Sequence, residues 1–153
     1  AEIIEYNRQN SDTAMPWFKQ EILEMAEAKG GLNSQEYLDA LKVMKEQAGP
    51  LGIDKVMDEN HLDGIVALTG SAAWSIDLVN GDHFLGGSSS PAAMAGYPNI
   101  TVPAGFLHHL PVGISFFGKA YTEGRLLEMA YAFEQLTRAR KKPEFIKSHL
   151  ATV

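Results

Sequence analysis

The chain has 153 residues, a formal net charge of −6 at pH 7 and 45% hydrophobic residues, values typical of one globular domain. This composition excludes a disordered, collagen-like or coiled-coil chain, and the negative charge argues against nucleic-acid binding, which requires clustered Lys and Arg. Because cysteine is absent, the chain has no disulfide framework, thiolate nucleophile or Cys-rich zinc site.

The first 60 residues are predicted to be mostly helical. The first ten carry little periodicity, and Asp12 or Thr13 is expected to cap a helix with Pro16 in its first turn. The glycines at 30–31 should end that helix. Asn33, followed by Glu36 three residues later, is typical of a capping box that opens a second helix.

A break is expected in this helical region at the Gly-Pro pair of residues 49–50, because a residue before proline avoids helical geometry. A third, shorter helix is predicted for about residues 51–60. The apolar run at 64–69 then predicts a short strand that is buried on both faces. The Gly- and Ser-rich segment 70–90 is long for a loop inside a compact domain, and such loops are often functional.

The second half of the chain predicts a short helix, a hairpin and a long helix. Pro91 suits the start of the short helix, and Gly96 ends it. Residues 100–103 and 112–117 are predicted to pair as antiparallel strands, with Pro103 at a strand end because it cannot donate to the ladder.

Thr122 is expected to cap the last helix, and Pro143 to stop it. Positive charge at residues 138–142 suits the negative end of that helix's dipole. These elements predict an α/β fold in which a small mixed sheet packs with helices. Since three strands are few for this length, we expect the sheet to be part of a larger one with an open edge.

The segment that follows the first strand, residues 69–84, is expected to border a substrate cleft, because clefts in open α/β sheets lie at the carboxyl ends of strands. It mixes apolar walls with a few polar groups, as ligand pockets do. Six residues are the candidates for lining the cleft: Trp74, Asp77, Asn80, Asp82, His83 and Phe84. The alternative is an ordered surface loop packed on its own aromatic residues.

Other patterns in the sequence could also carry chemistry. The GGSSS run at 86–90 matches neither a phosphate loop nor a nucleophile elbow, and the simpler interpretation is a loop in which Ser89 or Ser90 caps the next helix. The Asp, Asn and His residues of the candidate cleft lack calcium-loop spacing, and adjacent His108 and His109 would point to opposite sides. We therefore expect no metal site.

Separate blocks of sequence occur in a defined order along the chain. They are WFKQE at 17–21, LDGIVA at 62–67, AGYPNITVP at 95–103, LPVG at 110–113, FG at 117–118, LL at 126–127 and AYAFEQ at 130–135. In this order they resemble the C-terminal portion of amidase-signature enzymes, and they are most similar to free-standing bacterial amidases. The last blocks also resemble the A subunit of glutamyl-tRNA amidotransferase. The resemblance covers residues 15–143, with a lead-in at 1–14 and a tail at 144–153.

The resemblance implies a fragment of the larger amidase-signature α/β/α fold. That family hydrolyses carbon–nitrogen amide bonds with a Ser–cis-Ser–Lys triad and needs no cofactor. Its lysine and serines lie before the matched region, so we expect the triad outside this chain and assign no catalytic residue to it. The implied substrate is a small-molecule amide, and the chain alone is expected to be inactive and to self-associate. The alternative is a self-contained, non-catalytic binding or interaction module that derives from an amidase.

Two further absences bear on location. No run approaches the roughly 18 apolar residues of a membrane span, and no basic segment followed by an apolar one opens the chain as in a secretory signal. Together with the missing cysteines, they lead us to expect a cytoplasmic protein without a membrane partner. The first residue is Ala1 rather than Met, so we expect a chain that is processed or comes from something longer.

Overall fold

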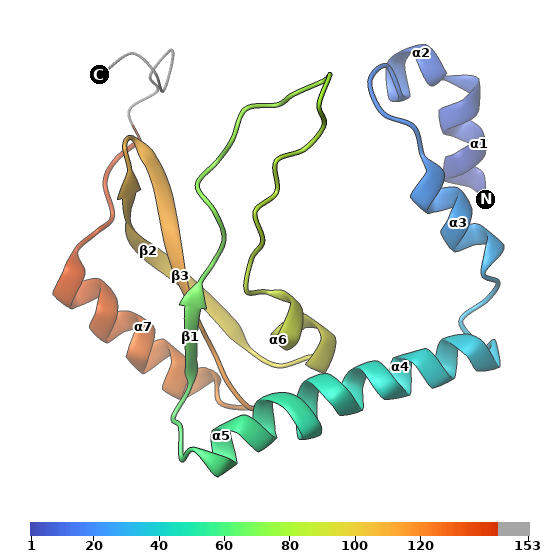
Figure 1. Ribbon diagram of the computed structural model, residues 1–153. Helices are drawn as coiled ribbons and strands as arrows, with labels where there is room; N and C mark the ends of the chain where they lie inside the picture. Colours follow the sequence, from blue (N-terminus) through green and yellow to red (C-terminus); the bar gives the residue numbers. More distant parts are fainter. Residues whose placement is uncertain (144–153) are drawn as a thin grey trace.

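The structure, a computed structural model, describes residues 1–143 (Figure 1). The tail expected at 144–153 lies outside the described residues. In chain order the elements are α1 (Glu2–Gln9), α2 (Ser11–Ala14), α3 (Glu21–Ala28), α4 (Gln35–Ala48), the π-helical segment η1 (Gly49–Asp54), α5 (Lys55–Glu59), β1 (Ile65–Leu68), α6 (Ser90–Ala95), β2 (Asn99–Leu107), β3 (Leu110–Phe117) and α7 (Glu123–Thr137).

The N-terminal helices differ from the prediction. The first ten residues, which lack a clear period, form α1, and the predicted helix from residue 12 or 13 is instead the short α2, an irregular stretch containing Pro16, and α3. Tertiary hydrogen bonds explain the change. The buried side chain of Gln20 accepts from Asn7 Nδ2 at 3.0 Å and donates to the Ile4 carbonyl at 3.1 Å, which ties the irregular stretch to α1.

One nearly continuous rod is formed by α4, η1 and α5, so the predicted break at 49–50 is wrong (Figure 1). The helix widens into a π turn there instead, which accommodates Pro50, a residue that would clash with a carbonyl of the preceding turn in an α-helix. The start of α4 is also displaced by one residue. Ser34 rather than Asn33 is the cap, and its hydroxyl accepts from the Tyr37 amide.

The sheet has the order β1-β3-β2, and both pairings are antiparallel. The α/β fold class is confirmed, but the sheet is antiparallel rather than mixed because the hairpin inserts β3 between β1 and β2. The hairpin turns at His108 and His109, so its strands are longer than predicted. Pro103 lies inside β2, beside a register shift between Pro103 and Gly105, and β2 is an edge strand that tolerates a missing N–H.

Helices cover the two faces of the sheet unequally. On one face, η1, α5 and α6 enclose a core of Ile53, Met57, Ala92 and Phe117. On the other, α7 packs on β2 and β3 and leaves the outer side of β1 open. Val66 and Leu68 are 55% and 67% exposed there. The prediction that this strand is buried on both faces is therefore wrong for the described chain.

The helices of the second half begin where predicted. Ser89 is the N-cap residue of α6, although its hydroxyl makes no capping bond, and Gly96 ends the helix. Thr122 likewise precedes α7, but its hydroxyl donates to the Lys119 carbonyl rather than capping. The end of α7 is earlier than predicted: it stops at a left-handed Arg138 and not at Pro143.

Candidate functional site

The predicted cleft residues lie on a long excursion between β1 and α6, which rises beyond the sheet in Figure 1. A bridge between Gly70 and Gly87 joins the two arms of this excursion at its base. The Ser88 amide also donates to the Thr69 carbonyl at 3.2 Å. The excursion is therefore anchored directly at the carboxyl end of β1.

Aromatic contacts organise one half of this loop. Trp74 Nε1 donates to Asp82 Oδ1 at 2.5 Å, and the rings of Trp74 and Phe84 lie 6.0 Å apart at an angle of 56°. These contacts hold the outgoing and returning arms together across eight to ten residues. Three of the six sequence candidates thus meet in one cluster.

Hydrogen bonds to Asp77 hold the other half of this loop together. Its Oδ1 accepts from the amides of Val79 at 2.9 Å and Asn80 at 2.8 Å, and its Oδ2 accepts from Asn80 Nδ2 at 2.9 Å. These donors, the Asn80 amide first, lower the pKa of Asp77 to about 2. His83 Nε2 lies 3.6 Å from Asp77 Oδ2. The remaining three candidates are therefore joined through one ionised carboxylate.

The loop and the sequence around it carry acidic residues but no Lys or Arg. No Lys or Arg occurs between Lys55 and Lys119, while Asp77 and Asp82 lie on the loop. The loop also exposes apolar side chains: Ile76 is 85% and Val79 92% exposed. A ligand held here would meet apolar surface, carboxylates and His83, with no Lys or Arg from this stretch of sequence.

A group of hydroxyls at the base of the loop was not among the residues predicted from the sequence. The Oγ atom of Ser115 lies 2.8 Å from Thr69 Oγ1 and 2.9 Å from Thr101 Oγ1. Ser115 is only 2% exposed, whereas Thr101 is exposed. The one available signal was a polar residue within the apolar run of β3, which alone does not identify its partners.

The GGSSS run meets the base of the loop through Gly87 and the Ser88 amide. The hydroxyls of Ser71 and Ser88 are buried and have no hydrogen-bond partner. The run joins the bridge at Gly87 to Ser89, the N-cap residue of α6, as the simpler interpretation predicted, although the Ser89 hydroxyl makes no capping bond. Within the described residues, no group of three or more His, Asp or Glu side chains could hold a metal ion.

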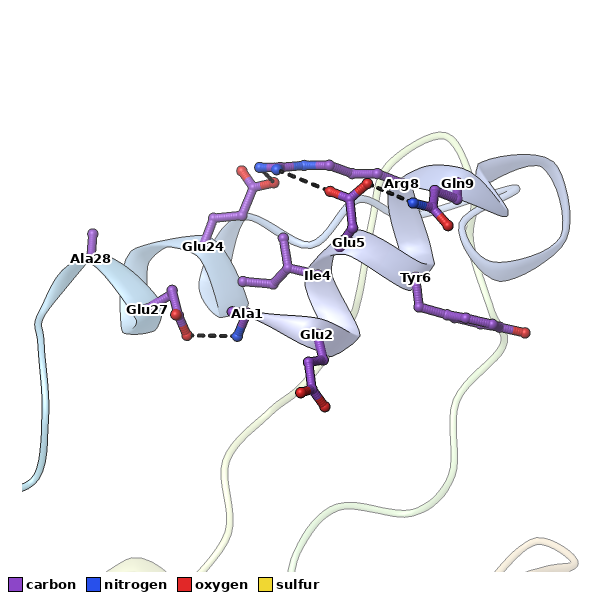
Figure 2. A pocket seen from close by; sticks show the side chains of 10 residues that line it. All are labelled: Ala1, Glu2, Ile4, Glu5, Tyr6, Arg8, Gln9, Glu24, Glu27 and Ala28. Carbon is purple, nitrogen blue, oxygen red and sulfur yellow. Dashed lines mark hydrogen bonds and ion pairs between the residues drawn. The ribbon is translucent and has the colours of Figure 1, made fainter.

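Two hollows of the described chain lie elsewhere. One of about 750 Å³ lies beside α1 and α3 and is shown in Figure 2. Its polar side chains bind one another: Arg8 pairs with Glu24 at 2.9 Å, and Gln9 donates to Glu5 at 2.8 Å. A smaller, apolar hollow of about 290 Å³ lies between Val56, Ile65 and Met94, next to the core. Neither hollow contains the predicted cleft residues.

The chain is similar in sequence to known amidases, although no family model matches it. It is 42% identical over 149 residues to a probable amidase of Arabidopsis thaliana, which covers 95% of this chain and 25% of that protein. It is 55% identical over 51 residues to the A subunit of glutamyl-tRNA(Gln) amidotransferase from Desulforudis audaxviator, covering 33% of this chain and 10% of that protein.

The crystal structure of the native peptide amidase from Stenotrophomonas maltophilia is similar to this fold. The TM-score is 0.84 at 43% sequence identity, over 94% of this chain and 28% of that one. The chain therefore spans about a quarter of the length of these amidases. No helix among residues 1–143 has the length and apolar character needed to cross a bilayer.

Proposed function

The chain is related to a C-terminal portion of the amidase-signature enzymes, and we propose that it forms part of an enzyme that hydrolyses carbon–nitrogen amide bonds. The observation that carries this proposal is the combined likeness in sequence and fold, which extends over 94% of the chain. The substrate would be a small amide, such as the amide of a short peptide. No cofactor is required for this chemistry.

The nucleophile and its base would come from outside these 153 residues. A serine attacks an amide only when a base is positioned to take its proton. The serines at 88–90 have no Lys or Arg within their own stretch of sequence, since none occurs between Lys55 and Lys119. We therefore propose a Ser–cis-Ser–Lys triad in the portion of the relatives that this chain does not cover.

The loop of residues 69–84 would line the substrate cleft of the assembled enzyme. Its contacts hold six side chains of mixed polarity in two groups of three, one around Trp74 and one around Asp77. The test is Asp82→Ala and His83→Ala in the full-length enzyme. We expect at least one to change kcat/KM for a peptide amide, and Asp39→Ala on α4 to leave it unchanged. Wild-type kinetics with every substrate for both loop variants would refute the cleft assignment.

Activity of the isolated chain tests the location of the triad. We expect the 153-residue chain to hydrolyse no primary amide above background, and the full-length enzyme to do so. Hydrolysis by the chain alone that is lost in Ser89→Ala would instead place the nucleophile in the GGSSS run. A complete, non-catalytic binding module remains the second candidate, because no catalytic residue is assigned to this chain. The mass of the native gene product separates the two proposals.

Two finer expectations stay predictions. A cytoplasmic location and a bacterial type of amidase were expected from the sequence, and the relatives include a plant protein as well as bacterial ones. Fractionation of the source cells and the sequence surrounding this chain would test them.

A further inference from the structure

Three hydroxyl groups, two from strands and one from the residue that follows β1, meet on the face of the sheet that also carries the core. Thr101 on β2 is paired with Ser115 on β3, and Thr69 directly follows β1 and donates its amide to the Gly113 carbonyl at 2.9 Å. The Oγ of Ser115 lies between the two threonine hydroxyls, at 2.8 and 2.9 Å. The two threonine oxygens are 3.4 Å apart. We call Thr69, Thr101 and Ser115 the hydroxyl cluster.

The three hydroxyl groups do not use all of their hydrogen-bonding capacity on one another. Three hydroxyls supply three protons and six lone pairs. The two short contacts use two protons, and the third contact, at 3.4 Å, is at the limit of a hydrogen bond. The cluster therefore keeps at least three unused lone pairs, and a hydroxyl proton is available whenever the long contact is not made. Exposed Thr101 is where these groups can meet a ligand.

The setting of the cluster also favours a ligand. It lies at the base of the loop, where the Ser88 amide binds the Thr69 carbonyl. Two more hydroxyls near this base, those of Ser71 and Ser88, are buried without a partner. Buried polar groups are rarely left unpaired in folded proteins. The base of the loop is therefore rich in hydroxyl groups.

We propose that the hydroxyl cluster binds an uncharged polar group of the substrate, a peptide-type carbonyl or carboxamide. This inference rests on the proposed amidase function. Hydroxyls both donate and accept, which matches the C=O and N–H groups of an amide. A free carboxylate fits less well, because the stretch between Lys55 and Lys119 has no Lys or Arg while its loop carries Asp77 and Asp82.

The experiment compares Thr101→Val, which removes the hydroxyl but keeps the shape, with Thr101→Ser, which retains the hydroxyl. Both are made in the full-length enzyme and assayed with an N-acetylated dipeptide amide. We expect Thr101→Val to raise KM about three- to tenfold, the effect of one hydrogen bond, with kcat little changed, and Thr101→Ser to stay near wild type. Thr137→Val, whose hydroxyl binds the Phe133 carbonyl at 2.8 Å in α7, is the matched control.

A second measurement keeps the inference independent of catalysis. Calorimetry with the hydrolysis-resistant N-methyl amide of the same dipeptide, and with its free acid, should show weaker binding of the acid, and weaker binding of the amide to Thr101→Val. An unchanged KM and unchanged amide binding in Thr101→Val, or equal losses in Thr101→Val and Thr101→Ser, would overturn the inference. An enzyme that binds the amide through Thr101 but hydrolyses no amide would overturn the proposed function alone.

Discussion

The hydroxyls of Thr69 and Thr101 lie 3.4 Å apart although β3 separates their strands. Neighbouring strands are about 4.8 Å apart, so side chains two strands apart do not ordinarily meet. Here they lean toward each other over Gly113, which has no side chain to separate them. A Cβ at this position would lie 2.8 Å from Thr69 Oγ1 and 2.9 Å from Thr101 Cγ2.

Gly113→Ala should therefore destabilise the protein. The added methyl forces both threonines apart, and overpacking of this kind costs about 1–3 kcal/mol of unfolding free energy. Urea denaturation measures the loss. Gly124→Ala is the control: it lies in α7 with nothing within 4 Å of the new Cβ, and it should be neutral or stabilising. Equal stabilities of the Gly113→Ala variant and the wild type would show that the threonines move apart freely.

Tyr97→Phe should also lower stability. The Tyr97 hydroxyl donates to Asp54 Oδ2 at 2.7 Å, and Asp54 Oδ1 is already buried without a partner. Removing the donor leaves both carboxylate oxygens unpaired, at a cost of about 1–3 kcal/mol. Thermal or urea unfolding provides the measurement, with the exposed Tyr131→Phe as a control that should have no effect. The prediction is wrong if the two variants are equally stable.

The same contact predicts a loss of stability at high pH. Hydrogen bonding to Asp54 raises the pKa of Tyr97 above its usual value of 10.0. Because the folded pKa is the higher one, this contribution is complete below pH 10 and disappears as the pH rises through the folded pKa. Absorbance titration of tyrosinate, compared between wild type and Tyr97→Phe, should reveal one tyrosine with a raised pKa. A difference spectrum that titrates at the ordinary value contradicts the contact.

Acid should loosen the loop through Asp77. Its pKa is lowered from 3.8 to about 2, so its contribution is present above pH 3.8 and is lost as the pH falls toward 2. Carbon NMR of the Asp77 carboxyl measures the titration directly. Asn80→Ala removes the side-chain donor but keeps the amide, and should move the pKa part of the way back toward 3.8. Titration of wild-type Asp77 near 3.8 would mean that the turn is open in solution.

Trp74→Phe should make the loop easier to cleave. The substitution keeps an aromatic ring near Phe84 but removes the N–H donor to Asp82, which links the two arms. Limited proteolysis followed by mass spectrometry should find faster cleavage within 75–85. Trp17→Phe, at a residue that is 70% exposed, is the matched control and should be cleaved like wild type. Identical cleavage of the two variants would assign no holding role to the Trp74 bond.

The isolated chain should self-associate. The outer edge of β1 has no partner strand among the described residues, and Val66 and Leu68 are exposed on the open face beside it. Free edges and apolar faces promote pairing, most simply as a two-fold dimer. Sedimentation at micromolar concentration should find a dimer that Leu68→Lys weakens and Val43→Lys on α4 does not. A 16.7 kDa monomer that binds no hydrophobic dye would refute the prediction.

Local sequence signals correctly predicted most of the helices and strands in the second half of the chain. Pro91 and Gly96 mark the ends of a short helix because their backbone preferences act wherever they occur. The N-terminal region was predicted less well because Gln20 binds back to Ile4 and Asn7, contacts that no local pattern contains. The longer hairpin depended on an irregularity beside Pro103, which lets proline remain inside an edge strand.

The candidate site likewise has contacts that the local sequence predicts and contacts that depend on the tertiary structure. The grouping of Asp77 with Asn80 is a local turn, and Asp followed by Asn three residues later is a readable signal for one. The contact between Trp74 and Asp82 follows from their positions on opposite arms of one loop. The hydroxyl cluster could not be predicted, because it depends on the register that sets Thr101 opposite Ser115 and on the missing side chain of Gly113.

The π turn of η1 rotates α5 about the helix axis relative to α4. An α-helix turns about 100° per residue, so one extra residue in a turn rotates everything after it by that angle. The apolar side of α5 is therefore rotated relative to that of α4, and Met57 on α5 lies in the core. Gly52 makes the turn possible, since a Cβ there would lie 2.6 Å from the Gln47 carbonyl oxygen. Deleting a single residue here would preserve the helix but turn Met57 away from the sheet.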